Sequence, residues 1–100
     1  MNPYRVFVTP AAVKEIKALP GNMRQRVRLA ISELTTQPRP SSSKELAQAL
    51  TPHEARRQRI ENWRIIYTVS DVEATIDVLG VRKRPPYDYA DLERLLDQFP

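Results

Sequence analysis

The chain has 100 residues, no cysteine and one histidine, His53, and its formal net charge at pH 7 is +4. The missing cysteines exclude disulfide scaffolds, thiolate nucleophiles and zinc fingers, and a single histidine excludes a histidine–metal cluster and a paired-histidine mechanism. The 16 Lys and Arg against 12 Asp and Glu favour a polyanion or an acidic protein as partner. We expect one domain, residues 1–100, that needs neither a metal nor another cofactor.

No segment predicts export or insertion into a membrane. Residues 1–5 lack a cationic region followed by an apolar stretch, so we expect no signal peptide. No apolar run approaches the roughly 20 residues that a membrane-spanning helix requires. The expected location is the cytoplasm.

The N-terminal part predicts one strand and two helices. Residues 4–8 are rich in β-forming side chains, which is typical of a short strand. Thr9 and Pro10 then supply an N-cap and a proline at the first helical position, followed by apolar residues at helical spacing. Residues 20–22 interrupt that helix, and a second apolar stripe covers residues 23–34. Two helices joined this tightly are expected to form a hairpin.

The C-terminal part predicts three consecutive strands and a final helix. Residues 54–60, 63–70 and 74–81 are rich in β-branched and aromatic side chains and are separated by tight turns, which is typical of an antiparallel meander. Residues 44–50 fit either a helical turn or a short edge strand. The last helix is indicated by Leu92, Leu95, Leu96 and Phe99. The expected order, β-α-α-β-β-β-α, describes an α+β domain with an N-terminal strand and a helical hairpin packed on an antiparallel sheet.

Cations gather on and beside the last predicted strands. Arg57 and Arg59 alternate with other residues, so a strand projects them from the same face, and Arg64 lies in the next strand. A second cluster, residues 82–84, follows the last strand, and two tyrosines come shortly after it. Guanidinium groups held on a rigid sheet beside aromatic rings suit a ligand with phosphates and bases. The pattern points to RNA.

Each of these features also has a purely structural interpretation. The arginines of residues 56–59 can form a solvated edge strand that pairs with Glu54 and Glu61, and the cluster at residues 82–84 can keep the strand end soluble. Trp63 and Tyr67 share a face, so we expect them in the core rather than stacked on bases. The two tyrosines after the last strand can simply cover the edge of the sheet.

In this order and spacing, the motifs resemble those of the RelE/ParE toxin superfamily of bacterial type II toxin–antitoxin systems, over nearly the whole chain. The similar segments are the first helix with its Leu-Pro ending, the end of the second helix, the run of residues 57–67 and the strand ending at residues 81–84. Glu61-Asn62 stands where the family often has glycine and aspartate, and Trp63 replaces its usual tyrosine. Ala55 stands where the ribonuclease branch tends to carry lysine, and a bulged strand would let Arg56 supply that cation.

The RelE branch cleaves messenger RNA in the ribosomal A site, so the resemblance implies a metal-independent endoribonuclease that inhibits translation. Its implied nucleophile is the ribose 2′-hydroxyl. Arg64 and Arg84 would act on the phosphate, and Tyr89 would transfer a proton or stack on a base, with Tyr87 as its close rival. The implied RNA-binding residues are Arg56, Arg57, Arg59, Arg82, Lys83 and Tyr87.

The resemblance also implies a cognate antitoxin as protein partner. A ParE-type toxin is the alternative, because members of that branch resemble the chain in fold but poison DNA gyrase by binding and are not nucleases. A third hypothesis is a degenerate member that only binds a partner protein or operator DNA.

Overall fold

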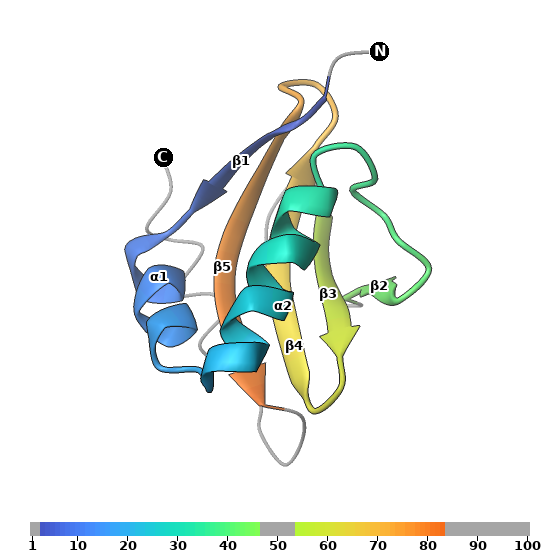
Figure 1. Ribbon diagram of the computed structural model, residues 1–100. Coiled ribbons are helices and arrows are strands. Elements are labelled where there is room, and N and C mark those ends of the chain that lie inside the picture. Colours follow the sequence, from blue (N-terminus) through green and yellow to red (C-terminus); the bar gives the residue numbers. More distant parts are fainter. Residues whose placement is uncertain (1–2, 47–53, 84–100) are drawn as a thin grey trace.

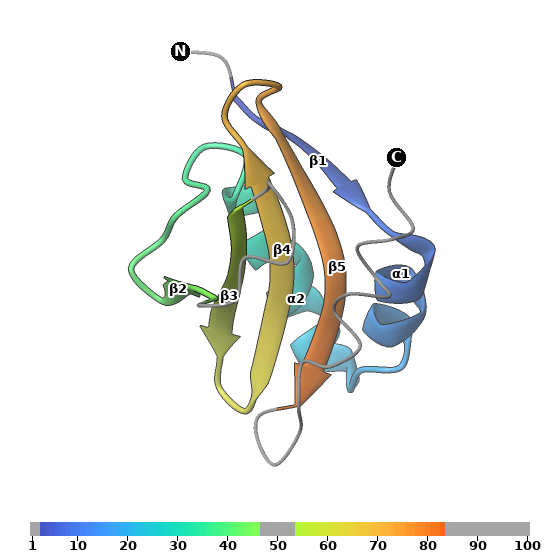
Figure 2. The same cartoon turned by 180° about the vertical axis from the view of Figure 1, so that it is seen from behind.

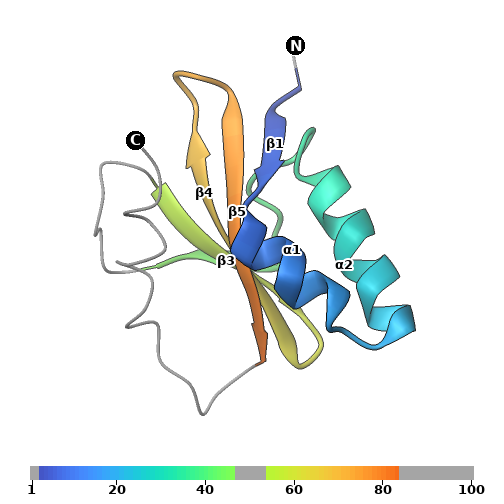
Figure 3. The ribbon, with the colours of Figure 1, turned by 90° about the vertical axis from the view of Figure 1, so that its left-hand side faces the viewer.

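The fold is a five-stranded sheet with two helices on one of its faces (Figures 1 and 3). It was obtained as a computed structural model, which describes residues 3–46 and 54–83. The elements in chain order are β1 (Arg5–Val8), α1 (Pro10–Lys17), α2 (Gly21–Glu33), β2 (Ser43–Glu45), β3 (Glu54–Ile60), β4 (Trp63–Ser70) and β5 (Thr75–Lys83). The strands lie in the order β1-β5-β4-β3-β2.

The helical hairpin forms as expected from its local signals. The hydroxyl oxygen of Thr9 accepts a hydrogen bond of 3.1 Å from the backbone N–H of Ala12, and Pro10 begins α1. After Pro20 the chain turns directly into α2. Within the described ranges, neither helix is both long enough and apolar enough to cross a bilayer.

The sheet is mixed rather than wholly antiparallel. Strands β2 to β5 are antiparallel neighbours, and β3, β4 and β5 form the expected meander. However, β1 runs parallel to β5, from the pair Arg5–Thr75 to the pair Val8–Val78. The tight turns fix the directions within the meander, whereas no turn links β1 to β5. The direction of β1 therefore depends on how the helical hairpin folds back over the sheet.

The observed element boundaries decide between the two alternatives for residues 44–50 and extend the last predicted strand. Residues 43–45 form a short edge strand that pairs with β3, so the strand alternative is correct for this segment. Strand β5 continues to Lys83, so that Arg82 and Lys83 belong to the sheet instead of following it. The predicted C-terminal helix lies outside the described residues.

The hydrophobic core lies between the helices and one face of the sheet. The helices bury Ala12, Ile16, Met23, Val27 and Ile31 in it. The sheet adds Ile65 and Tyr67, both fully buried, and Trp63 packs against the same cluster. Trp63 and Tyr67 are therefore core residues, as the sequence predicted.

A bulge in β5 keeps this core continuous. Ile66 pairs with Gly80, but Tyr67 pairs with Val78, so Leu79 has no opposite partner. The extra residue reverses the alternation of side chains along the strand. Val78 and Val81 consequently both join the core cluster, although they are separated by an odd number of positions.

Candidate functional site

Three arginines lie next to one another across three strands. In the strand register, Arg59 of β3 is opposite Arg64 of β4, and Arg64 is opposite Arg82 of β5. Arg57 precedes Arg59 by two positions in β3 and projects from the same face. We call these four residues the arginine face; Figure 2 shows the three strands that carry it with α2 behind them. Like charges at directly opposite positions repel each other, so this arrangement requires compensating groups.

Two backbone carbonyl groups hold Arg64. Its side chain is largely buried, with 9% of its surface exposed. The Nη1 atom donates hydrogen bonds to the carbonyl oxygens of Glu61, at 3.0 Å, and Trp63, at 2.9 Å. Glu61 takes a positive φ of 53° in the turn between β3 and β4. The turn therefore fixes the guanidinium group through neutral dipoles and does not neutralise its charge.

A carboxylate from helix α1 holds Arg82. The Oε2 atom of Glu15 lies 2.7 Å from Nε of Arg82, and its Oε1 atom accepts a 2.9 Å hydrogen bond from the backbone N–H of Val81. Strand β1 ends opposite Val78, so Glu15 occupies the edge of β5 beyond that end. A Cβ atom on Gly80 would lie only 2.8 Å from Oε1 of Glu15. The close approach of the carboxylate therefore requires glycine at this position.

Sequence reasoning did not find Glu15. A glutamate in an amphipathic helix fits a solvent-facing position, and nothing in its neighbours marks it. The available signal was Gly80, because a glycine inside a strand pattern often indicates that another group approaches the backbone closely.

The other two members of the arginine face differ in exposure. Arg59 is exposed and forms no hydrogen bond or ion pair with any residue in the described part of the chain. Arg57 is only half-buried. Arg59 is therefore a well-placed cation for an external anion on this face.

Two predicted RNA-binding residues project from the opposite face of the sheet. Arg56 lies opposite Tyr67, and its Nη1 atom is 2.7 Å from Oε2 of Glu54. Lys83 lies opposite Trp63, with its ammonium nitrogen 6.0 Å from the centre of the indole ring. The pairing of β3 with β4 runs without a bulge, so the condition under which Arg56 would supply the cation missing at Ala55 is not met. Neither residue extends the arginine face.

A separate polar cluster surrounds Arg39. Its guanidinium group pairs with Glu54 at 2.8 Å and with Asp71 at 2.9 Å, and Tyr4 donates its hydroxyl hydrogen to Asp71. The bonds from Tyr4 and then Arg39 lower the pKa of Asp71, and Arg39, followed by Arg56, lowers the pKa of Glu54. Each charge here has a partner from the same chain, which is the pattern of a structural network.

Metal binding finds no support in the part of the chain that is described. Within residues 3–46 and 54–83, no group of three or more histidine, cysteine, aspartate or glutamate residues is placed to hold a metal ion. Arg84, Tyr87 and Tyr89 lie outside these ranges, as does His53. The described site therefore consists of the arginine face and the two groups that hold it, Glu15 and the carbonyls of the β3–β4 turn.

Comparison with known proteins identifies the family. Residues 6–85 match the family described as the ParE toxin of the type II toxin–antitoxin system parDE. No curated protein sequence matches the chain significantly.

Similar folds occur among solved toxin structures. The archaeal RelE–RelB complex from Pyrococcus horikoshii contains a chain with 25% identity and a TM-score of 0.75, and the match covers 85% of this chain and 99% of that one. The RelBE2 toxin–antitoxin complex of Mycobacterium tuberculosis gives 26% identity and a TM-score of 0.66, covering 82% and 99%. Isolated RelE from Escherichia coli, with 20% identity, a TM-score of 0.68 and coverages of 93% and 98%, shares the fold. The chain therefore belongs to the ParE toxin family of type II toxin–antitoxin systems, within the RelE/ParE superfamily.

Proposed function

We propose that this toxin is a ribosome-dependent endoribonuclease that cleaves messenger RNA in the ribosomal A site. The observation that carries the proposal is the register that sets Arg59, Arg64 and Arg82 side by side across three strands. Guanidinium groups bond phosphate oxygens through two parallel N–H donors, and a rigid sheet fixes the positions from which they do so.

The proposed reaction is attack of the ribose 2′-hydroxyl on the adjacent phosphate. Negative charge develops on the non-bridging oxygens in the transition state, and fixed donors stabilise it without having to reorganise. Arg64 suits this role because both of its bonds to the β3–β4 turn use Nη1 and so leave its Nε–Nη2 edge out of that contact. Arg59 would bind the flanking backbone, and Arg82 would be held in line by Glu15.

Proton transfer needs another group, because arginine stays protonated at all relevant pH values. A tyrosine, with an ordinary pKa of about 10, is a better candidate. We assign this role to Tyr89, with Tyr87 as its rival, and a second phosphate contact to Arg84. These three assignments rest on the resemblance to the RelE branch.

We further propose that a cognate antitoxin keeps the toxin inactive. The solved relatives from P. horikoshii and M. tuberculosis are toxin–antitoxin complexes, which supports a partner of this kind. The net charge of +4 favours an acidic segment over the arginine face.

An in vitro translation reaction followed by primer extension tests the nuclease. Wild-type toxin should produce cuts in messenger RNA only when ribosomes are present, and replacement of Arg64, Arg84 or Tyr89 by alanine should weaken them. Intact messenger at saturating toxin, with ribosomes that still translate a control template, would overturn the proposal.

The second candidate function is poisoning of DNA gyrase without nuclease activity. The match of residues 6–85 to the ParE toxin family favours it. A supercoiling assay with purified gyrase separates the two functions, since only a ParE-type toxin should block supercoiling at concentrations near that of the enzyme.

A further inference from the structure

An ion pair ties the turn between β3 and β4 to helix α2. The Nη1 atom of Arg26, in the second turn of α2, lies 2.5 Å from Oε2 of Glu61. Figures 1 and 3 show the first half of α2 and this turn at the same end of the sheet. Arg26 directly precedes Val27, which is fully buried in the core, so its cation extends from a firmly packed stretch of helix. The pair therefore connects an exposed turn to the packed part of the fold.

Glu61 holds two arginines with two different groups. Its carboxylate pairs with Arg26, and its backbone carbonyl oxygen accepts the 3.0 Å hydrogen bond from Nη1 of Arg64. The second carbonyl that holds Arg64 belongs to Trp63, which packs against the core. Glu61 is exposed and lacks such packing. A movement of the turn that separates its carboxylate from Arg26 therefore also redirects the carbonyl that fixes Arg64.

The backbone of Glu61 gives a reason for its side chain. Glu61 and Asn62 form a two-residue loop, since Ile60 pairs with Trp63, and Glu61 has a positive φ of 53°. Glycine adopts a positive φ without strain, whereas glutamate does so at a cost. A glutamate here is accounted for if its carboxylate makes a contact that glycine cannot make. Within the described residues, that contact is the pair with Arg26.

We propose that Arg26 is a positioning residue for Arg64. It acts through Glu61: the ion pair holds the β3–β4 turn so that the carbonyl of Glu61 points at the guanidinium group, and this fixes Arg64 relative to the scissile phosphate. The inference rests on the nuclease proposed above and adds a residue, on the helical side of the sheet, on which the cleavage rate depends. Arg26 itself makes no contact with the RNA.

The pair should affect the rate of cleavage much more than the stability of the fold. Its side chains are 51% and 59% exposed, and exposed ion pairs contribute little to folding. By contrast, a small misplacement of a group that acts on the transition state can lower a rate by about 10²-fold. Loss of the pair should therefore be nearly invisible in unfolding and clearly visible in cleavage.

Single-turnover cleavage of messenger RNA on ribosomes, at increasing toxin concentrations, tests the proposal. Arg26→Ala should lower the maximal rate about tenfold. It should leave the toxin concentration at half-maximal rate unchanged, because no contact with the substrate is lost. Arg26→Lys should keep most of the rate, since an ammonium group can still pair with the carboxylate. Glu61→Gly should lower the rate without lowering the free energy of unfolding, because glycine relieves the cost of the positive φ.

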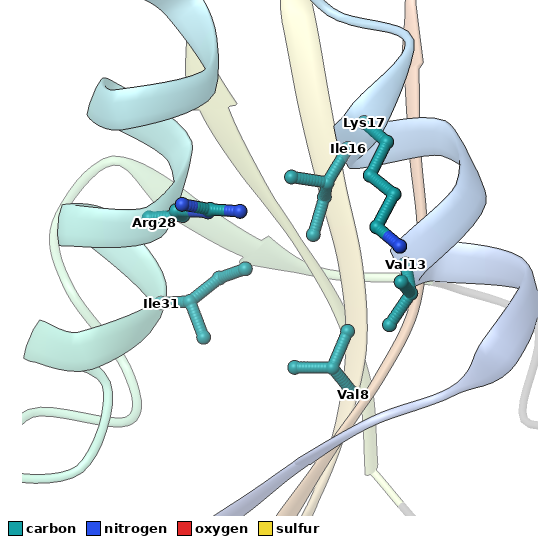
Figure 4. Close-up of a pocket in the computed structure, with 6 residues that line it drawn as sticks. All are labelled: Val8, Val13, Ile16, Lys17, Arg28 and Ile31. Atoms are coloured by element: carbon teal, nitrogen blue, oxygen red, sulfur yellow. The ribbon is translucent and has the colours of Figure 1, made fainter.

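Arg28→Ala is the matched control. It removes the same charge from the same helix, but residues two positions apart do not share a helix face. Figure 4 shows Arg28 turned toward the pocket between the helices, which Val13 and Ile31 also line. Its rate and half-maximal concentration should stay close to those of the wild type. The exchange Arg26→Glu with Glu61→Arg restores the pair with reversed charges and should recover rate relative to either single variant.

A measurement on the free protein separates this inference from the nuclease proposal. Two carbonyl groups hold Nη1 of Arg64, so its hydrogens should exchange slowly with solvent in NMR spectra. Arg26→Ala should accelerate this exchange, and Arg28→Ala should not. Equal exchange in the wild type and Arg26→Ala overturns the inference, whether or not the toxin cuts RNA.

The kinetic outcomes are equally decisive. A raised half-maximal concentration of Arg26→Ala, at an unchanged maximal rate, overturns the inference, since Arg26 would then be a binding contact. A loss of rate equal to that of Arg28→Ala overturns it too, because the effect would follow from net charge alone. A wild-type toxin that cuts no RNA, but whose Arg64 exchange still depends on Arg26, overturns the nuclease and leaves the link between these two arginines standing.

Discussion

The carboxylate of Glu15 lies 2.7 Å from the guanidinium group of Arg82 and thereby joins helix α1 to the arginine face. The same carboxylate accepts the backbone N–H of Val81 at the edge of β5. One side chain therefore satisfies a sheet edge and also fixes a cation of the proposed site. Its approach depends on the missing side chain of Gly80.

Gly80→Ala should destabilise the protein only while Glu15 is present. The added Cβ would lie 2.8 Å from Oε1 of Glu15, so the carboxylate must move and give up its bond to Val81 and its ion pair. We expect a loss of about 1–3 kcal/mol in the free energy of unfolding. In a Glu15→Ala background the same change should be neutral or stabilising by about 0.5–1 kcal/mol, because alanine is better than glycine in a strand.

The double-mutant cycle consists of the wild type, Gly80→Ala, Glu15→Ala and the double variant. Urea unfolding of these four proteins measures the coupling free energy between positions 15 and 80. Gly21→Ala is the matched control, since a Cβ there meets no atom within 4 Å and no comparable loss is expected. Equal losses from Gly80→Ala in both backgrounds would contradict the proposed contact.

Glu15→Gln should have opposite effects on RNA binding and on cleavage, because Glu15 both neutralises the charge of Arg82 and fixes its position. Glutamine can still accept the N–H of Val81, but it no longer neutralises Arg82. Single-stranded RNA should bind more tightly. The plot of the logarithm of the binding constant against the logarithm of the salt concentration should become steeper by about 0.7, the value for one added phosphate contact. The rate of messenger cleavage should nevertheless fall, because Arg82 is no longer held in line with Arg64.

Fluorescence anisotropy at several salt concentrations measures RNA binding, and the cleavage assay measures the rate, so together they check whether the two effects are opposite. Glu33→Gln makes the same change in charge at an exposed position of α2 and serves as the control. If Glu15→Gln and Glu33→Gln behave alike in both assays, Glu15 is not a positioning residue.

Local patterns predicted most of the fold and three of the four members of the arginine face. The turn at Glu61-Asn62 places Arg59 opposite Arg64, and both lie within one hairpin whose register follows from its short loop. The position of Arg82 opposite Arg64 is different. It depends on the bulge at Leu79, which changes the register of β5. The adjacent Gly80 is a signal of an irregular strand, but it does not say whether a bulge or a close approach causes the irregularity.

Tertiary contacts decided the remaining features. Alternation along β3 predicted that Arg57 shares a face with Arg59, and the observed pairing adds that Arg56 lies opposite the core residue Tyr67. Glu15 is more than sixty positions from Val81 in the sequence, and such a distant contact leaves no local pattern. The parallel direction of β1 likewise depends on packing of the hairpin and not on a turn.

Replacement of Arg64 by lysine should impair cleavage although the charge is kept. The Nη1 atom of Arg64 bonds to the carbonyls of Glu61 and Trp63, and the planar guanidinium group still has its Nε–Nη2 edge for a phosphate. A lysine ammonium group has a single nitrogen and cannot hold the carbonyls and present such an edge at the same time. We expect the cleavage rate to fall about 10²–10³-fold, as when one fixed donor is removed from an anion-stabilising site. Primer extension under single-turnover conditions provides the measurement.

Arg59→Ala is the companion variant to Arg64→Lys. Because Arg59 is exposed and has no partner in the described part of the chain, its removal should weaken RNA binding while stability changes by less than about 0.5 kcal/mol. For the prediction on Arg64, full cleavage activity of Arg64→Lys would contradict the role of a positioned guanidinium group at the phosphate.

Tyr67→Phe should destabilise the core through one lost hydrogen bond. The hydroxyl of Tyr67 donates to the carbonyl oxygen of Pro38 at 2.8 Å, and burial raises the pKa of this tyrosine. Without the donor, the carbonyl loses a buried partner, and the free energy of unfolding should fall by about 1–3 kcal/mol. Tyr4→Phe is the control, because its hydroxyl bonds to Asp71 at an exposed position and should matter less. Equal effects of the two changes in thermal unfolding would contradict this account.

Acid should weaken the cluster around Arg39 before it affects the rest of the fold. Hydrogen bonds from Tyr4 and Arg39 lower the pKa of Asp71, and a bond from Arg39 lowers the pKa of Glu54. A carboxyl group whose pKa is lower in the folded than in the unfolded state contributes stability above its unfolded value, and this contribution is lost as the pH falls through its folded value. The midpoint of urea unfolding should therefore decrease below about pH 4, the ordinary range of these carboxyl groups.

The double variant Glu54→Gln with Asp71→Asn isolates this part of the pH dependence. It should be less stable than the wild type at pH 7 and should lose less stability than the wild type between pH 5 and pH 2, since it has two fewer carboxyl groups to protonate. Glu33→Gln, which lies outside the cluster, should leave the dependence of stability on pH as it is in the wild type. A double variant whose unfolding midpoint follows the wild-type curve throughout this range would show that the pairs with Arg39 do not stabilise the fold.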